Sequence, residues 1–225
     1  MTYIISLGGS LIAPKNGIDW KFLRKFRALV IGQIQKGNKF IIIAGGGITC
    51  RDYISAASKV ITIADEDKDW LGIHASRLNA HLLRTIFFDV AHPVIIDNPS
   101  KKIKTNSFLV IGAGWRPGNS TDYVAVYLAK TYKVKMVINL SNIDYAYNKD
   151  PNKYKDARKI KEMKWVDFRK IVGDKWTPGL NIPFDPIASR LAEELKLQVI
   201  IVNGKKLKNL ENCLDGKKFK GTIIK

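Results

Sequence analysis

Residues 40–51 read Phe-Ile-Ile-Ile-Ala-Gly-Gly-Gly-Ile-Thr-Cys-Arg, and this segment decides the fold. Its apolar, β-branched first half predicts a strand that is covered on both faces of a sheet. The three glycines let backbone amides approach a ligand with no Cβ in the way. A helix predicted from Ile48 would point its free N–H groups at the same place, and Arg51 adds a guanidinium suited to phosphate. We therefore expect an anion site here, with a ligand-free strand-to-helix turn as the alternative.

Composition favours an α/β protein with a full core. The chain has 225 residues, 46% of them hydrophobic, which is enough for one large domain or two small ones. The formal charge of +18 suits an anionic partner, but the basic residues are scattered, so charge alone does not select one. Two cysteines without a C-x-x-C pair predict no zinc site. The lack of a basic leader and of a long apolar run predicts a soluble, cytoplasmic protein that binds no membrane.

Strand-like and helix-like segments alternate along the chain. Strands are predicted at 3–7, 40–44, 94–96, 108–111, 136–140 and 198–202. Helices are predicted at 19–36, 48–60, 65–88, 121–132 and 186–196, and a hairpin within 145–163. In the third helix we expect Leu71, Leu78 and Leu82 to point inward. The alternation indicates a three-layer α/β/α sandwich with a mainly parallel sheet.

Three glycine-bearing loops follow predicted strands, at 8–10, 45–47 and 112–122. In an open parallel sheet such loops meet in one crevice, where their amides can bind a polyphosphate. A G-x-x-x-x-G-K-[ST] loop is absent, and the dinucleotide pattern G-x-G-x-x-G fails at Pro117. Neither G-x-S-x-G nor H-E-x-x-H occurs. The loops therefore favour phosphoryl transfer, which depends chiefly on positioning and charge neutralisation.

Several of these segments together resemble the amino-acid-kinase superfamily, and within it the archaeal type of UMP kinase. The segments, in order, are 5–10, 44–47, 51–54, 69–73, 76–80, 117–122, 141–144, Tyr147, 150–151, 184–188 and 221–224. The double-glycine loops mark the superfamily only. The helix motif 77–80 (Arg-Leu-Asn-Ala) and the loop 117–122 (Pro-Gly-Asn-Ser-Thr-Asp) are similar to UMP kinases more narrowly.

The resemblance implies transfer of the ATP γ-phosphate to UMP, giving UDP, in pyrimidine nucleotide synthesis. It implies Mg²⁺ held through the ATP phosphates, with no metal ligand from the chain. The catalytic residues it implies are Ser10, Arg51 and Asp122. Those implied for ATP are Gly8, Gly9, Ser10, Gly47, Arg51, Ser141, Asn142, Tyr147 and Asp150. Those implied for UMP are Gly46, Asp69, Trp115, Arg116, Pro117, Gly118, Asn119, Ser120 and Thr121.

The resemblance also implies one domain over 1–225, with an acceptor-binding lobe at about 1–125 and an ATP-binding lobe at about 126–225. It implies a homo-oligomer, a hexamer built as a trimer of dimers, in which the long first helix is a candidate interface. Two positions depart from the family. Ser6 stands where many relatives have a lysine, and Tyr145 stands where a glycine is usual. Because a glycine there suggests a turn with positive φ, we expect the hairpin beside the adenosine to be reshaped.

Other interpretations remain open on the sequence alone. Within the same fold, the acceptor could be isopentenyl phosphate, carbamate or an acylated amino acid. The chain could also bind nucleotides without turnover, and the charge alone would allow a nucleic-acid-binding module, although we expect no nucleic acid partner. Individual residues have structural alternatives as well. Asp69, Ser120 and Asp122 could be helix caps, and Tyr147 could be a packed aromatic of the hairpin. Arg77 could form a structural ion pair at a subunit contact or bind a ligand.

Overall fold

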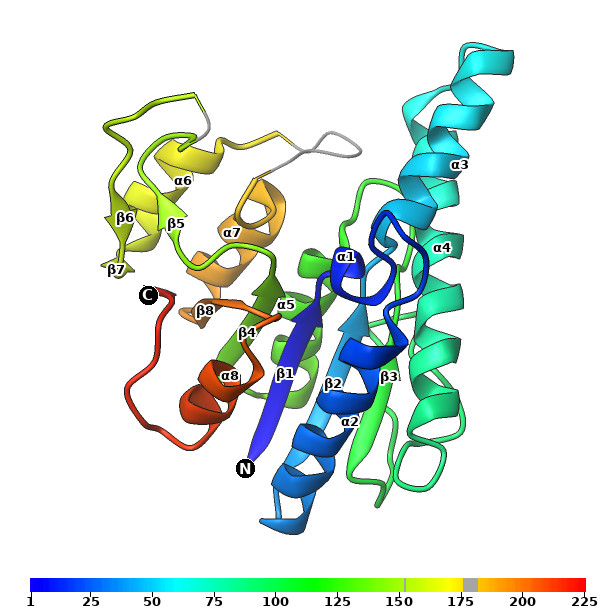
Figure 1. Cartoon of the computed structure of the whole chain (residues 1–225), viewed down its shortest axis with the longest axis vertical. Helices are drawn as coiled ribbons and strands as arrows, with labels where there is room; N and C mark the ends of the chain where they lie inside the picture. The colour runs from blue at the N-terminus through cyan, green and yellow to red at the C-terminus, as the bar shows by residue number, and fades with distance from the viewer. Residues whose placement is uncertain (152, 176–181) are drawn as a thin grey trace.

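The computed structural model describes residues 1–151, 153–175 and 182–225. Its main sheet has seven strands in the order β3-β2-β1-β4-β8-β9-β7, and β5 and β6 form a separate hairpin (Figure 1). The strands are β1 Thr2–Leu7, β2 Lys39–Ala44, β3 Leu109–Gly112, β4 Met136–Ser141, β5 Ala146–Tyr147, β6 Lys159–Ile160, β7 Glu162–Met163, β8 Gln198–Asn203 and β9 Thr222–Ile224. All pairs in the main sheet are parallel except β8 with β9. The predicted α/β sandwich with a mainly parallel sheet is confirmed.

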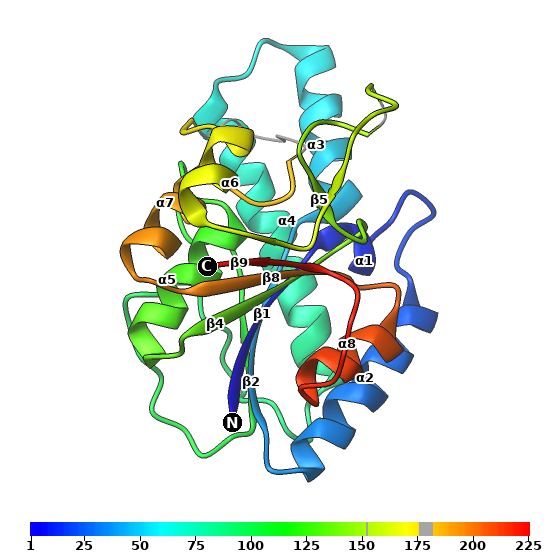
Figure 2. The same ribbon diagram turned by 90° about the vertical axis from the view of Figure 1, so that its left-hand side faces the viewer.

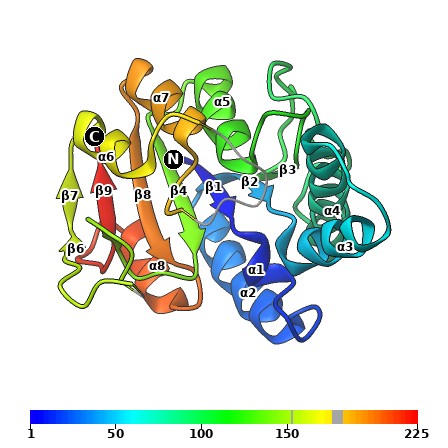
Figure 3. The same cartoon turned by 90° about the horizontal axis from the view of Figure 1, so that it is seen from above.

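Helices cover both faces of this sheet. They are α1 Gly9–Ile12, α2 Trp20–Gln35, α3 Gly47–Val60, α4 Asp65–Ile86, α5 Thr121–Tyr132, α6 Trp165–Val172, α7 Pro186–Glu194 and α8 Leu207–Leu214. One apolar core joins the sheet to α2, α4 and α8, and the other joins it to α5, α6 and α7. Figure 3 shows α2 and α8 on one side of the strands, α5 and α7 on the other, and α3 outside α4 at the β3 edge.

The apolar runs reflect this burial on two sides. In β1, Ile4 and Ile5 are both fully buried, yet they belong to opposite cores. In β2, Ile42 and Ile43 divide in the same way. A strand buried on both faces carries no alternation of polar residues, which is why an apolar run rather than a period of two marked these strands.

The prediction for the third helix was wrong at Leu78. Its side chain is 64% exposed, whereas Ser76, Asn79, Ala80 and Leu83 form the buried stripe of α4. These four positions follow the helical spacing of 3 and 4 residues, and Leu78 lies about 100° away from Asn79 around the helix axis. Leu78 was predicted to point inward because its side chain is apolar. Asn79 was not predicted to be buried because its side chain is polar.

Residues 94–96 do not form the predicted strand. The chain there makes two isolated bridges to β3, one from Ala91 and one from Ile96, and Val94 is 60% exposed. The pairing is interrupted after Ala91 because His92 folds onto Val94, with His92 Nδ1 within 3.0 Å of the Val94 carbonyl oxygen. The backbone that would continue a strand is therefore used in a local turn.

The C-terminal part contains elements that the sequence did not predict. β9 pairs antiparallel with β8 near the C-terminus (Figure 2), and α6 and α8 were not predicted either. The hairpin predicted within 145–163 is present as β5 and β6. The backbone φ of Tyr145 is not positive. Among the described non-glycine residues, positive φ angles occur at Lys133 and Lys196. The hairpin thus forms without the left-handed turn that a glycine at this position suggested.

Within the described residues, none of the helices combines the length and the apolar character needed to cross a membrane.

Candidate active site

The first two glycine loops are packed backbone against backbone. A Cβ added to Gly9 would lie 2.0 Å from the Gly47 nitrogen, and one added to Gly47 would lie 2.5 Å from the Gly9 carbonyl oxygen. Gly47 also has φ of +70°, a conformation that glycine adopts at little cost. The glycines are thus required first by the contact between the two loops. That contact brings the ends of β1 and β2, and the N-termini of α1 and α3, to one place.

Asn79 holds the second glycine loop from below. Its side chain is 2% exposed, and its Nδ2 donates to the carbonyl oxygens of Gly45 (2.8 Å) and Gly46 (3.2 Å). Both carbonyls are thereby turned toward α4, while the Ile48 amide at the start of α3 donates to the Ala13 carbonyl oxygen at 3.0 Å. Asn79 belongs to the Arg-Leu-Asn-Ala motif, but its positioning role was not predicted. The available signal was a polar residue inside an otherwise apolar helix stripe.

A cavity of about 190 Å³ opens above this loop, between α3, α4 and the third glycine loop. Of the residues predicted for UMP, it is lined by Gly46, Asp69, Asn119, Ser120 and Thr121. Gly47 and Arg51, which were predicted for ATP, also line it. The residues that sequence reasoning missed are Cys50, Ile54, Lys68, Gly72, Ile73, Ser76 and Gly114. The cavity therefore joins two segments, α3 and the third loop, that the sequence assigned to a common site.

Asp69 fixes the third loop. It lies one turn inside α4, whose N-cap is Ala64, so the capping alternative for Asp69 is wrong. Its Oδ2 instead accepts a hydrogen bond from the Gly118 amide at 2.7 Å. Gly118 has φ of +78°, and this left-handed turn directs its N–H toward the carboxylate.

Two other α4 side chains hold the beginning of the same loop. The Ser76 hydroxyl accepts from the Gly114 amide at 2.8 Å. Arg77 donates to the carbonyl oxygens of Gly114 (3.3 Å) and Trp115 (3.1 Å), so it helps to position this loop. The guanidinium of Arg116 lies 4.1 Å from the centre of the Trp115 ring. Trp115, Arg116, Pro117 and Gly118 shape the loop but do not line the cavity.

Ser120 and Asp122 behave differently at the start of α5. Ser120 is the N-cap and accepts from the Tyr123 amide at 3.1 Å, which confirms its capping role. Asp122 does not cap: its Oδ1 accepts from Ser6 Oγ at 2.7 Å, and its Oδ2 lies 3.4 Å from the Asp185 amide nitrogen. Ser6, at the place of the lysine that many relatives carry, thus becomes a hydrogen-bond donor to this carboxylate.

Asp122 and Asp185 are neighbouring acidic residues at the starts of α5 and α7, and neither lines the cavity. Burial raises the pKa of Asp122 to about 6, opposed by the Ser6 hydrogen bond and reinforced by the nearby Asp185. Burial also raises the pKa of Asp185, which is 3% exposed and caps α7 through the Ala188 amide. Its second oxygen, Oδ2, is buried and has no hydrogen-bond partner among the described residues.

The residues predicted for ATP are placed around β4 and the hairpin. The Gly8 amide donates to the Leu140 carbonyl at 2.8 Å, so Gly8 lies against the end of β4, where Ser141 follows. Ser10 accepts from Arg51 Nη2 at 3.0 Å, which links the first loop to α3. Tyr147 is in β5 and Asp150 in the turn after it. Of the residues predicted for ATP, Gly47 and Arg51 line the cavity described above. The others do not line it: Gly8, Gly9, Ser10, Ser141, Asn142, Tyr147 and Asp150.

Three glycine loops at the carboxyl ends of parallel strands, with a helix N-terminus and an arginine beside them, define a phosphate-binding crevice of the α/β type. The model of the amino acid kinase family matches residues 1–203, and the chain belongs to that family. It is 32% identical to "Uridylate kinase" of Methanococcus aeolicus, across 100% of this chain and 99% of the relative. It is 34% identical to "Uridylate kinase" of Thermoplasma volcanium, across 95% and 93% of the two chains. The crystal structure of uridylate kinase from Archaeoglobus fulgidus superposes with a TM-score of 0.83, at 27% identity and full coverage of both chains. The predicted resemblance is confirmed.

Proposed function

We propose that this chain is a UMP kinase, which transfers the γ-phosphate of ATP to UMP and releases UDP and ADP. The observation that carries the proposal is the cavity of about 190 Å³, where the start of α3, Arg51 and Asp69 meet the third glycine loop. The full-length relatives named uridylate kinase support the same acceptor.

The acceptor phosphate would lie at the N-terminus of α3. The backbone amides at Gly46 and Gly47 and the helix dipole favour a dianion there. Arg51, one turn further, offers a planar guanidinium that can contact both the acceptor and the transferred phosphate. Since the UMP phosphate is already an anionic nucleophile, no general base is required, and the residues act by positioning and charge neutralisation.

Asp69 and the third loop would select the nucleoside. The Asp69 carboxylate is the hydrogen-bond acceptor on this wall of the cavity, and it is held in place by the Gly118 amide. In the proposal it accepts from a ribose hydroxyl of UMP, while Asn119, Ser120 and Thr121 contact the base and the phosphate. These assignments predict that a phosphate acceptor without a ribose is used less well than UMP.

ATP would bind on the β4 side, across Gly8, Gly9 and Ser10, with Ser141, Asn142, Tyr147 and Asp150 near the adenosine. Mg²⁺ would be held through the phosphate oxygens of ATP, which are the hard donors that this ion prefers. When bound, Mg²⁺ neutralises charge on the ATP phosphates. Asp122 would then orient the groups around the transferred phosphate, anchored by Ser6.

The test is a coupled assay of ADP release with Mg·ATP and a set of acceptors: UMP, CMP, dUMP and isopentenyl phosphate. Turnover is expected to be highest with UMP. Arg51→Ala should lower kcat/KM by at least about a hundredfold, a range typical of a lost electrostatic contact in the transition state. Arg24→Ala, which removes an exposed arginine of α2, is the matched control and should leave the rate unchanged. Isothermal calorimetry that detects UMP binding without turnover of any acceptor would refute catalysis and favour the binding-only alternative.

The proposal includes a cytoplasmic homo-oligomer. Figure 1 shows α3 and the beginning of α4 projecting past the carboxyl ends of the strands. None of the α3 residues is buried, and Tyr53, Val60 and Ile61 are 64%, 87% and 66% exposed. By contrast α2, the long first helix, uses its apolar stripe within the chain's own core. The exposed apolar side of α3 is therefore the better interface. Light scattering should give a mass above that of one chain, and Tyr53→Asp with Ile61→Asp should lower it.

A further inference from the structure

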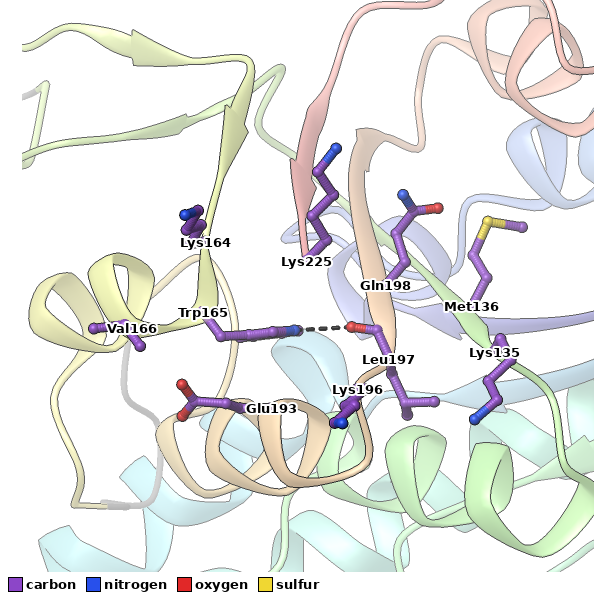
Figure 4. Close-up of a pocket in the computed structure, with 10 residues that line it drawn as sticks. All are labelled: Lys135, Met136, Lys164, Trp165, Val166, Glu193, Lys196, Leu197, Gln198 and Lys225. Atoms are coloured by element: carbon purple, nitrogen blue, oxygen red, sulfur yellow. Dashed lines mark hydrogen bonds between the residues drawn. The ribbon is translucent and has the colours of Figure 1, made fainter.

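A second and larger cavity lies at the other end of the sheet, away from the crevice. It occupies about 750 Å³, in the size range of small-molecule sites. It is formed before the first residues of β4 and β8, by the beginning of α6, the end of α7 and Lys225 after β9 (Figure 4). β4 and β8 run parallel to β1, whose carboxyl end carries the first glycine loop, so this cavity at the amino ends of β4 and β8 opens on the opposite edge. We call it the basal pocket.

The floor of the basal pocket is apolar and fixed. Trp165 is 4% exposed, and its indole Nε1 donates to the Leu197 carbonyl oxygen at 2.8 Å, as drawn in Figure 4. Leu197 itself is 3% exposed, and Met136 and the partly exposed Val166 continue the apolar surface. The indole has thus satisfied its only donor within the protein. The floor offers a ligand van der Waals contact and no hydrogen bond from that ring.

The rim is made of lysines. Lys135, Lys164, Lys196 and Lys225 surround the floor, and Figure 4 shows them on both sides of the Trp165 ring. Lys196 reaches its place through a left-handed backbone conformation, with φ of +51°. All four side chains are exposed, so they can reorient toward a bound group.

The acidic side chains nearby are already paired. Glu193 is the acidic side chain among the described residues that line the pocket, and it accepts from Arg169 at 2.7 Å. Lys225 is bound to Glu162 at 2.7 Å. Lys135, Lys164 and Lys196 have no carboxylate within ion-pair distance in the described part of the chain, and the residues outside it, 152 and 176–181, include no acid. These ammonium groups give the rim a positive charge that attracts an anion.

We propose that the basal pocket is a second anion site, and that it takes an organic phosphate: a phosphomonoester group held by Lys135, Lys164 and Lys196, with an apolar body on Leu197 and Met136. A phosphate dianion offers three acceptor oxygens and two charges, which matches three separate ammonium groups better than a single carboxylate does. The apolar floor requires that the rest of the ligand be poorly hydrated. The proposal does not rest on the kinase function, because the two sites share no residue.

The test uses 1-naphthyl phosphate as the probe, titrated by calorimetry against the full chain with the crevice filled by saturating UMP and ADP. One site is expected, and 1-naphthol or inorganic phosphate alone should bind at least about tenfold more weakly, because each provides only one of the two contacts. The double variant Lys164→Glu, Lys196→Glu should weaken binding by about tenfold or more, since two attractions become repulsions. The matched control is Lys21→Glu, Lys25→Glu on α2, which changes net charge equally and should bind like the wild type.

Three results would overturn the proposal: no saturable binding, equal loss in the two double variants, or loss of binding in Arg51→Ala, which would place the probe in the crevice. The circular dichroism spectrum of each variant is recorded first. If Lys164→Glu, Lys196→Glu did not fold, the single variants Lys164→Gln and Lys196→Gln would be compared in its place, and unchanged affinity in both would equally reject the site.

Discussion

Replacing Asp122 with asparagine should stabilise the folded protein above pH 6 and change its stability little near pH 4, because the carboxyl that it removes has a pKa raised by burial to about 6. Asparagine is neutral at every pH and close in shape to the protonated acid. Its Oδ1 can still accept from Ser6 Oγ, the shorter of the two contacts of this side chain at 2.7 Å. The contact that it gives up, from the Asp185 amide, is long at 3.4 Å.

The size of this stabilisation follows from the difference between the pKa of Asp122 in the folded protein and its pKa in the unfolded protein. The pKa of Asp122 is about 6 when folded and near the ordinary value of 3.8 when unfolded. A raised folded pKa means that the folded state holds the proton more tightly, so this stabilisation is complete below pH 3.8 and is lost as the pH rises through 6. A difference of about two pKa units corresponds to at most about 3 kcal/mol, and because Asp122 is partly exposed to solvent we expect a gain of about 1–2 kcal/mol for Asp122→Asn at pH 8.

The assay is urea unfolding of the wild type and the variant at several pH values between 4 and 8, where the difference in unfolding free energy is the quantity of interest. Asp52→Asn, which removes an exposed carboxylate of α3, controls for the change in net charge. The reasoning is refuted if the difference between Asp122→Asn and wild type does not change with pH, or if Asp52→Asn gives the same pH dependence.

Three further substitutions test how the loops are held. Asn79→Ala should lower the free energy of unfolding by about 1–3 kcal/mol, because two carbonyl groups lose their hydrogen-bond donor. It should also raise the KM for UMP. Urea unfolding measures the first effect and initial rates the second, and an unchanged KM would contradict the positioning role. Gly9→Ala places a Cβ 2.0 Å from the Gly47 nitrogen and should prevent a stable fold, which a thermal melt would show. Gly32→Ala, at a position with open space around it, is the control and should melt like the wild type. Asp69→Ala removes the acceptor of the Gly118 amide and should weaken UMP binding by about tenfold, while the affinity for ATP stays the same. Calorimetry measures both affinities. An equal loss of affinity for the two nucleotides would show a general loss of structure.

The sequence predicted the frame of this molecule because its strands are buried on both faces. The run 40–44, closed by glycines, could be interpreted without knowledge of its neighbours, and Asp19 and Asp185 both cap their helices as an N-terminal acid should. Segments with weaker local signals failed. The strand expected at 94–96 was lost to a turn at His92, and three-residue β9 is a strand only because β8 lies beside it.

The site was predicted as a set of loops but not as a network, since contacts between distant residues leave no local pattern. The hydrogen bond from Ser6 to Asp122 joins residues 116 positions apart. From the sequence, Ser6 could be described only as the absence of a lysine. The structure gives it a partner in Asp122, which lies inside α5 after the N-cap Ser120 and therefore does not cap that helix.

The glycines show where a correct prediction had an incomplete reason. The run of three was interpreted as freedom for a ligand to approach, yet a Cβ at Gly9 or Gly47 would collide with the backbone of the opposite loop before any ligand is present. The close contact fixes the N-termini of α1 and α3 relative to each other. Asn79 adds the orientation of the carbonyls, and Ser10 with Arg51 ties the two helices together through side chains. A binding site for two phosphates on opposite sides of this contact would therefore be preorganised by the folded backbone, so that little ordering remains to oppose binding or transfer.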